Sequence, residues 1–320
     1  MDEREERKIA NQYEQKLRQE TDSFIAELKG NVKEYLTGLH SNRYSAYVHL
    51  SDTGLGKRLS SHLSVAGAKP SDFFRKEMPN MKGYIADELV NDFYASIDAL
   101  SEWQISRSEY RRSFRSKNYR CYTTRIAQLV YDYHRLSQMD ATIVDLITGN
   151  VSGDLGLFCK YNYYGGVPEE ILAIRLDNND STLEKAIEDI IYDNNSKLSI
   201  NLIRGIVMSH NVKMYEALGK LLLAARLSEG LRQAICENID RGTKEAFLYL
   251  FQIIMEHNLI RFSSVMRAAG TWTGLLTIES KDLDRISQKQ IISGAMLLRR
   301  YMTDWNRLSI LPLKVRSTRG

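Results

Sequence analysis

A phrase that recurs three times in the C-terminal half of the chain limits the folds open to it. Each copy is a basic residue, an apolar residue and a serine, followed three residues later by another apolar residue. The copies start at Lys197, Arg226 and Arg261, so successive copies are 29 and 35 residues apart. An apolar run precedes each copy and another follows it. Repeats of this length are typical of stacked helix pairs.

The serine of each phrase stands where the second helix of a pair would begin. A serine hydroxyl at a helix start accepts a hydrogen bond from one of the backbone N–H groups that the first turn leaves unpaired. We therefore predict that Ser199, Ser228 and Ser263 are helix N-caps.

The run before each phrase has its apolar residues at the spacing of one helix face. The three faces are Leu183, Ile187, Ile190 and Ile191; Tyr215, Leu218, Leu221 and Leu222; and Phe247, Leu250, Ile253 and Ile254. One helix pair cannot cover such a face alone, so neighbouring pairs must stack. The pattern predicts an irregular HEAT- or armadillo-like α-solenoid with its core in residues 183–274.

Two longer runs in this region resemble a known family. KLLLAARLSEGLRQAI (Lys220–Ile235) and NLIRFSSVMRAAGTWTGL (Asn258–Leu275) are similar to an uncharacterised bacterial family of large proteins. Those proteins carry helical repeats, often with a MolR-type region and sometimes with a WGR module. The resemblance implies a HEAT-like fold within a longer chain and transfers no catalytic residue. No Trp-Gly-Arg sequence is present, so it implies no WGR module here.

The rest of the sequence also favours helices. Only four of the 320 residues are proline, and 43% are hydrophobic. We predict an all-α protein, with an irregular α-helical region in residues 1–150 and HEAT-like repeats in residues 151–320. The glycine-rich segment 149–167 is expected to be a loop at the boundary. Residues 1–40 have apolar positions at helical spacing, which predicts one long amphipathic helix or two helices broken near Gly30.

The segment Gly54-Leu-Gly56-Lys57-Arg58 superficially suggests a phosphate-binding loop. A Walker A loop needs a glycine five residues before the Gly-Lys pair and a serine or threonine after it. Ser51 and Arg58 occupy those positions. We therefore expect a glycine turn between helices.

The densest positive charge lies in residues 107–125, which contain Glu109 as their one acidic residue. The basic residues are Arg107, Arg111, Arg112, Arg115, Lys117, Arg120 and Arg125. Aromatic residues are interleaved with them, as suits phosphate contacts combined with base stacking. The other interpretation is a helix face whose aromatic residues are core and whose arginines pair with the acidic residues of segment 169–193.

No motif for catalysis, metal binding or cofactor binding is present. The six histidines form no HExxH motif, and the three cysteines, Cys121, Cys159 and Cys236, form no CxxC pair. We expect no enzymatic activity, no cofactor and no metal site. Widely spaced cysteines, with neither a signal peptide nor a membrane span, favour a cytoplasmic protein.

These observations predict a non-catalytic scaffold that binds another protein or another part of a longer chain. Arg226 and Arg232, with Arg261 and Arg267, would form a ladder that grips an acidic peptide. Alternatively, these arginines make salt bridges between adjacent repeats, for example with Glu229. Nucleic-acid binding through residues 107–125 is the main alternative function, and a non-catalytic portion of a larger enzyme is the second.

The sequence shows no convincing polar cap at the C-terminal end of the repeats. A solenoid needs such a cap at its ends. We therefore expect the sequence to be part of a longer protein.

Overall fold

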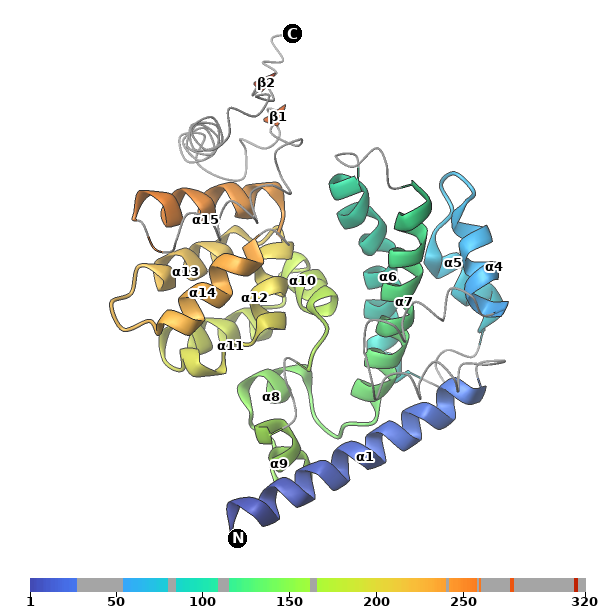
Figure 1. The fold of residues 1–320 in the computed structure, drawn as a ribbon, viewed down its shortest axis with the longest axis horizontal. Coiled ribbons are helices and arrows are strands. Elements are labelled where there is room, and N and C mark those ends of the chain that lie inside the picture. The colour runs from blue at the N-terminus through green and yellow to red at the C-terminus, as the bar shows by residue number, and fades with distance from the viewer. Residues whose placement is uncertain are drawn as a thin grey trace. The chain divides into compact units, whose positions relative to one another are not determined.

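The computed structural model describes residues 1–27, 54–79, 85–108, 115–161, 166–239, 242–257, 259, 277–278 and 314–315. The predicted all-α class is confirmed, because the described elements are helices except for one small strand pair (Figure 1). In this pair, β1 (Thr277–Ile278) runs parallel to β2 (Lys314–Val315). The chain divides into two compact units, Met1–Ile171 (unit 1) and Leu172–Gly320 (unit 2). The boundary expected after residue 150 stays a prediction.

Unit 1 is a group of helices around an aromatic core. The helices are α1 (Glu3–Glu27), α4 (Gly54–Leu63), α5 (Pro70–Glu77), α6 (Asp87–Ser108), α7 (Arg115–Ser137), α8 (Ile143–Thr148), α9 (Gly153–Tyr161) and the start of α10 (Glu169–Asp177). The ring of Phe93 on α6 meets Phe74 on α5 at 5.6 Å and Tyr133 on α7 at 5.3 Å, both edge to face. Edge-to-face rings stabilise a core beyond the area they bury.

The long amphipathic helix predicted near the N-terminus is confirmed as α1, which lies against α9 and α7 (Figure 1). Its inner face buries Ala10, Leu17 and Thr21. The predicted break near Gly30 lies outside the described residues.

Two expectations about glycine segments were wrong. The segment from Gly54 to Arg58 begins helix α4, where Leu59 is buried, and is no turn. The segment expected to be a loop contains α9, whose Phe158 is fully buried. Glycine is needed there at only a few points, such as Gly149, which ends α8 with φ of 68°. This left-handed conformation is one that glycine adopts without steric cost.

Unit 2 is also built from helices, and their arrangement as stacked repeats stays a prediction. After α10 come α11 (Ser181–Tyr192), a short 3₁₀ helix, η2 (Asn195–Lys197), α12 (Ile200–Met208), α13 (Val212–Leu222), α14 (Glu229–Asn238) and α15 (Lys244–Glu256). The predicted apolar faces of α11 and α13 are all buried, and on α15 only Ile253 is partly exposed. The residues expected to continue the array beyond α15 lie outside the described part.

The predicted serine caps are confirmed wherever the structure describes them. The hydroxyl of Ser199 accepts a hydrogen bond from the N–H of Leu202 at 3.2 Å, and that of Ser228 from the N–H of Leu231 at 3.3 Å. Ser263 lies outside the described residues. The first helices are capped too, by Asp180, Asn211 and Thr243, which the sequence analysis missed.

Contacts between the first helices of the pairs show that these helices run in the same direction. At the start of α13, the Asn211 amide donates to Glu184 near the start of α11, with Nδ2 to Oε1 at 2.6 Å. Further on, the ring of Tyr215 on α13 lies 5.7 Å from that of Tyr249 on α15. A Cβ placed on Gly219, one turn later, would meet both Tyr249 and Ile253. The helices α11, α13 and α15 are therefore parallel neighbours.

The second helices of the pairs form their own contacts. α12 packs against α14, and the Arg204 side chain of α12 donates to Asn238 of α14, with Nε to Oδ1 at 2.7 Å. The N–H of Thr243, at the start of α15, donates to the carbonyl of Val207 near the end of α12 at 2.8 Å. The turn before each new pair is thus joined to the preceding pair.

The glycine at the α13–α15 contact gives a first prediction. A Cβ at Gly219 would lie 2.7 Å from Ile253 Cδ1 and 2.8 Å from Tyr249 Cε1, which is too close. Gly219→Ala should therefore lower the free energy of unfolding by roughly 1–3 kcal/mol in urea titrations. The control is Gly230→Ala on α14, where a Cβ meets nothing within 4 Å, and we expect a gain of about 0.5–1 kcal/mol. Equal effects of the two changes would contradict the close packing.

The cap that joins two pairs gives a second prediction. Asn211 caps α13 and also donates to Leu176 O at 3.2 Å and to Glu184. Asn211→Ala removes the cap and the donor to a carboxylate, so the free energy of unfolding should fall by roughly 2–4 kcal/mol. Ser228→Ala removes only a cap, at an exposed position, and should lower the free energy of unfolding by about 1 kcal/mol. Chemical denaturation of both variants checks this difference.

Candidate interaction surface

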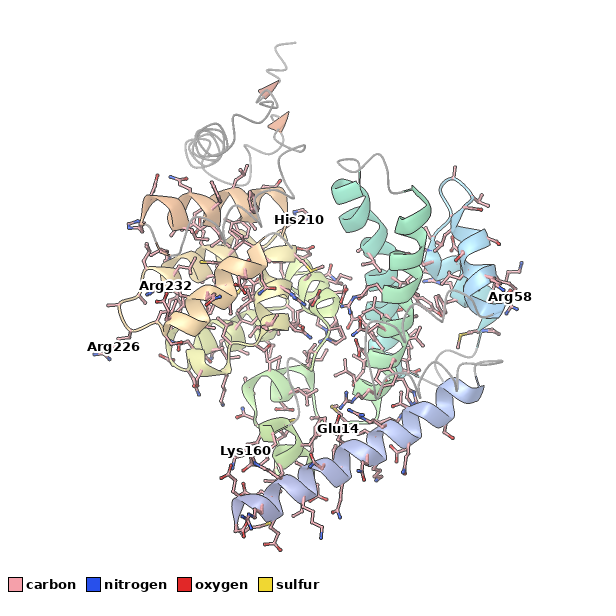
Figure 2. All side chains as sticks on the ribbon, viewed as in Figure 1. Glu14, Arg58, Lys160, His210, Arg226 and Arg232 are labelled. Carbon is pink, nitrogen blue, oxygen red and sulfur yellow. The ribbon has the colours of Figure 1, made fainter. Side chains whose placement is uncertain are left out.

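The turns within the helix pairs gather at one edge of unit 2. Because α11 and α13 are parallel and start side by side, they also end at the same side, and the turns 193–199 and 223–228 follow there. The turn between pairs, which holds His210, lies at the other ends of the helices. Figure 2 shows Arg226 and His210 on opposite sides of unit 2. We call the side with the within-pair turns the turn edge.

Large apolar side chains are exposed at the turn edge. Tyr192 at the end of α11 is 55% exposed, Ile200 at the start of α12 is 49% exposed, and Leu223 after α13 is 47% exposed. In the described part of the chain, the other large hydrophobic residues this exposed are Met1 and Val65, both in unit 1. Exposed apolar side chains concentrated in one region are characteristic of surfaces that bind a partner.

The charges of the turn edge differ between its two turns. At the first turn, the exposed Lys197 is balanced by the exposed Asp193. At the second, Lys220 and Arg226 are both exposed. The second turn is therefore basic, and Leu223 lies between its two cations in the sequence.

Arg226 and Arg232, predicted to act together, have different surroundings. Arg232 is 19% exposed; its Nη1 lies 3.3 Å from Glu229 Oε2 and its Nη2 donates to Ala224 O at 3.5 Å. The alternative interpretation, pairing with Glu229, is thus observed for Arg232, but within α14 and not between repeats. The Arg226 side chain is exposed and points away from the helices (Figure 2). Arg261 and Arg267 lie outside the described residues.

Of the basic side chains in residues 107–125, the structure describes that of Arg125 alone. The side chains of Arg107, Arg111, Arg112, Arg115, Lys117 and Arg120 lie outside the described part, so nucleic-acid binding by them stays a prediction. Arg125 faces inward and contacts Glu170 through two hydrogen bonds, with Nε to Oε1 at 2.5 Å. This is the internal pairing with the acidic segment that the sequence allowed. For Arg125 this pairing favours the interpretation in which the arginines pair with the acidic segment, and nucleic-acid contact stays a prediction.

Arg125 belongs to a cluster of buried charges between α7 and the start of α10. Glu170 is only 1% exposed, and Glu169 lies 3.9 Å from the Arg125 guanidinium. Burial opposes the charge of Arg125, but Glu170 and Glu169 raise its pKa above the usual value and keep it charged. Burial raises the pKa of Glu170, and Arg125 opposes that change. A buried charge left without its partner is strongly destabilising, so the two residues depend on each other.

Asp132, two turns along α7 from Arg125, is the titratable member of this cluster. Loss of hydration raises the pKa of Asp132 to about 6, and Arg125 and Arg135 oppose the shift without cancelling it. The sequence carried no signal for this group, because a lone aspartate in a helix is ordinarily solvated. Among the described residues, Asp132 belongs to no group of three side chains that could hold a metal ion.

The two described cysteine thiols are buried or half-buried, and the described residues contain no cluster of metal ligands. Burial raises the pKa of the Cys159 thiol to about 11 and that of Cys236 to about 12, which makes both weak nucleophiles at neutral pH. Within the described ranges, no three His, Cys, Asp or Glu side chains gather closely enough to hold a metal ion. No helix of the described part is both long and apolar enough to cross a membrane.

The raised pKa of Asp132 predicts a pH-dependent stability. Because the folded state binds this proton more tightly than the unfolded state, the contribution of Asp132 to stability is greatest below about pH 4 and is lost as the pH rises through about 6. Asp132→Asn should remove this loss, which raises the free energy of unfolding at pH 7 by roughly 1–3 kcal/mol relative to wild type. Urea titrations between pH 4 and 7 measure it. Asp140→Asn, at an exposed position, is the control and should leave the pH profile unchanged.

Comparison with known proteins yields a family without an assigned activity. The model of the Family of unknown function (DUF5724) matches residues 32–304. The description of that family names neither helical repeats nor a MolR-type or WGR region. No curated protein and no solved structure is significantly similar to the chain. The expectation that the chain belongs to an uncharacterised family is thus confirmed. Its link to MolR-related proteins with helical repeats stays a prediction.

Proposed function

The chain belongs to the Family of unknown function (DUF5724), and from this premise we propose that it is a non-catalytic scaffold that binds another protein through unit 2. The observation that carries the proposal is the exposure of Tyr192, Ile200 and Leu223 along the turn edge. Aromatic and aliphatic side chains of this size supply most of the binding energy when a partner removes them from water.

The proposal includes a HEAT-like α-solenoid for unit 2. Three observations support it: the parallel first helices α11, α13 and α15, the separate contact of α12 with α14, and the cap at each helix start. Stacked pairs present equivalent turns in a row, so a partner can contact successive turns as one extended surface. This arrangement also agrees with the repeat-containing, MolR-related proteins that two runs of the sequence resemble.

The chemistry of the turn edge indicates the kind of partner. Arg226 and Lys220 are exposed around Leu223, so an apolar residue of the partner flanked by carboxylates would complement the second turn. Charges at the rim of an interface act mainly on the association rate and on specificity, whereas the apolar residues supply affinity. We therefore propose an acidic peptide segment with apolar anchors as the partner.

Affinity capture from the native host with mass spectrometry tests the proposal. We expect the tagged full chain to retain a nuclease-resistant protein partner, and Arg226→Glu combined with Leu223→Ser to reduce its recovery roughly tenfold or more. The control is Lys185→Glu, which reverses the charge of an exposed residue near the other end of α11. Circular dichroism and urea titration establish that all variants remain folded.

Two results would contradict this function. Unchanged recovery with a folded Arg226→Glu, Leu223→Ser variant would exclude the turn edge as the contact surface. Recovery of nucleic acid, with all protein partners lost after nuclease treatment, would support the basic stretch 107–120 instead.

A further inference from the structure

Two exposed apolar residues of the turn edge, Tyr192 and Leu223, occupy the same position of successive first helices. Tyr192 is the twelfth residue after Asp180, which caps α11, and Leu223 is the twelfth after Asn211, which caps α13. The buried residues before them correspond in the same way: Leu183 with Met214, Ile187 with Leu218, and Ile191 with Leu222. An exposed apolar side chain therefore recurs at an equivalent place in both helices.

Helix formation and core packing do not explain an apolar residue at this position. The last turn of a helix carries partial negative charge, so a basic residue is the favourable choice there. Tyr192 and Leu223 each leave about half of the side chain exposed to water. Two such side chains on adjacent helix ends can be covered by a single partner, and we call them the two anchors.

The separation of the two anchors follows from the packing of their helices. α11 and α13 are parallel neighbours, joined at their starts by the hydrogen bond from the Asn211 amide to the Glu184 carboxylate. The axes of packed helices lie about 8–10 Å apart. Equivalent residues at the two helix ends are therefore separated by about 10 Å, along a line that crosses the helices.

A polyproline II segment matches this separation with a short sequence. It has three residues per turn and rises about 3.1 Å per residue, so residues three apart lie on the same side, about 9 Å from each other. Residues on one face of a β-strand repeat about every 7 Å, and an α-helix needs seven residues to span about 10 Å. Polyproline II segments also bind to aromatic surfaces at a low cost in conformational entropy, and Tyr192 supplies an aromatic ring.

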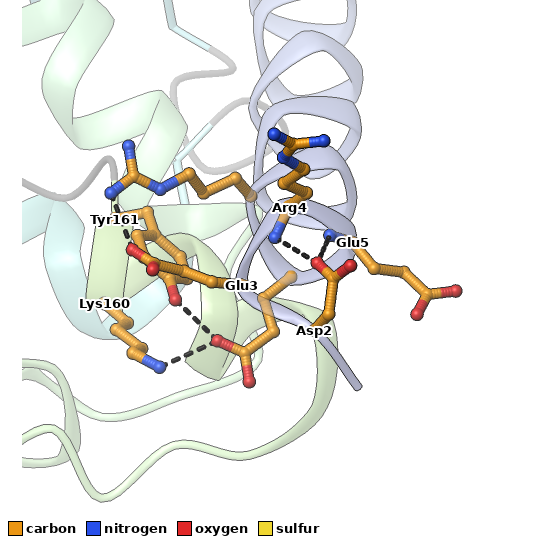
Figure 3. A network of polar contacts seen from close by, with 8 residues as sticks. Asp2, Glu3, Arg4, Glu5, Lys160 and Tyr161 are labelled. Atoms are coloured by element: carbon orange, nitrogen blue, oxygen red, sulfur yellow. Dashed lines mark hydrogen bonds and ion pairs between the residues drawn. The ribbon is translucent and has the colours of Figure 1, made fainter.

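The Leu223 anchor has positive charge available to a partner. Exposed cations elsewhere in the described chain pair with carboxylates, as Lys160 Nζ does with Glu6 Oε2 at 2.8 Å (Figure 3). Lys220 and Arg226, on either side of Leu223 in the sequence, form no ion pair with another described residue. A carboxylate of a partner would be attracted to this anchor.

The Tyr192 anchor has the opposite charge. Asp189 occupies on α11 the position that Lys220 occupies on α13, nine residues after the cap, and Asp193 follows Tyr192 directly. Both aspartates are exposed, and Lys197 balances only one of them. Opposite charges at the two anchors favour one orientation of a partner that carries charge at one end.

We propose that the turn edge binds a polyproline II segment of another protein in which two apolar residues stand three places apart. The apolar residue next to acidic residues contacts Leu223, and the other contacts Tyr192. This inference rests on the proposed function, since it names the conformation, spacing and orientation of the peptide that the turn edge binds.

Fluorescence anisotropy with labelled synthetic peptides tests the inference on the full chain. The probes are Leu-Pro-Pro-Leu-Asp-Glu and its reverse, Glu-Asp-Leu-Pro-Pro-Leu, which allow for either chain direction. The matched control of each has one more proline between the leucines, which turns them to different sides of the segment. We expect one probe to bind at least tenfold more tightly than its control. Equal binding of probe and control, or binding of neither probe, would overturn the inference.

Substitutions in the chain test the two anchors and the orientation. Leu223→Ser and Tyr192→Ser should each weaken binding of the preferred probe at least tenfold, because each removes one anchor. Arg226→Glu should weaken this probe and strengthen a version with two lysines in place of its acidic residues, at about 50 mM salt. Lys185→Glu is the control and should change neither. Unchanged binding by a folded Tyr192→Ser variant would contradict contact at both anchors.

The affinity capture described above distinguishes failure of this inference from failure of the proposed function. If the Arg226→Glu, Leu223→Ser variant loses the host partner while the wild-type chain prefers neither probe to its control, the turn edge binds a partner of another form, and only the inference is wrong. If capture of the host partner is unchanged in that variant, the turn edge is not the contact surface, and both are wrong.

Discussion

The first helices of unit 2, α11, α13 and α15, each bury an apolar face and lie side by side, and the rest of the unit depends on this packing. Leu183, Tyr215 and Phe247 are almost fully buried, and the ring of Tyr215 lies 5.7 Å from that of Tyr249 on the next of these helices. The caps then fix where each helix starts, and Asn211 joins the start of α13 to α11. Because α11 and α13 are parallel and of similar length, the two described turns that follow them, 193–199 and 223–228, lie on one edge.

Unit 1 is stabilised differently, because its helices are unequal in length and do not repeat. The long helix α7 contributes Tyr133 to an aromatic core and Arg125 to a buried ion pair with Glu170. The ion pair stabilises only while both partners are present, since either charge alone would be buried without compensation. An arginine from a strongly basic stretch of sequence therefore stabilises the fold through an internal ion pair. The density of charge along a sequence does not show which group each charged side chain contacts.

Features that depend on local chemistry could be predicted from the sequence, and those that depend on distant contacts could not. Helical spacing identified the buried faces, and the repeated serine identified the caps of α12 and α14. The caps of the first helices were missed because Asp180, Asn211 and Thr243 share a role without sharing a residue type. The raised pKa of Asp132 arises from burial among residues of α7 and α10, which no local pattern encodes.

Comparison of equivalent positions shows where the sequence departs from what folding alone requires. Ser228 is followed by Glu229, which suits the positive end of α14 and pairs with Arg232 at 3.3 Å. Ser199 is followed instead by Ile200, which is 49% exposed and gains nothing from the helix end. An apolar residue that breaks a local rule without a gain in packing is expected at functional positions. Ile200 lies at the turn edge with the exposed side chains of Tyr192 and Leu223, so this departure coincides with the surface proposed for partner binding.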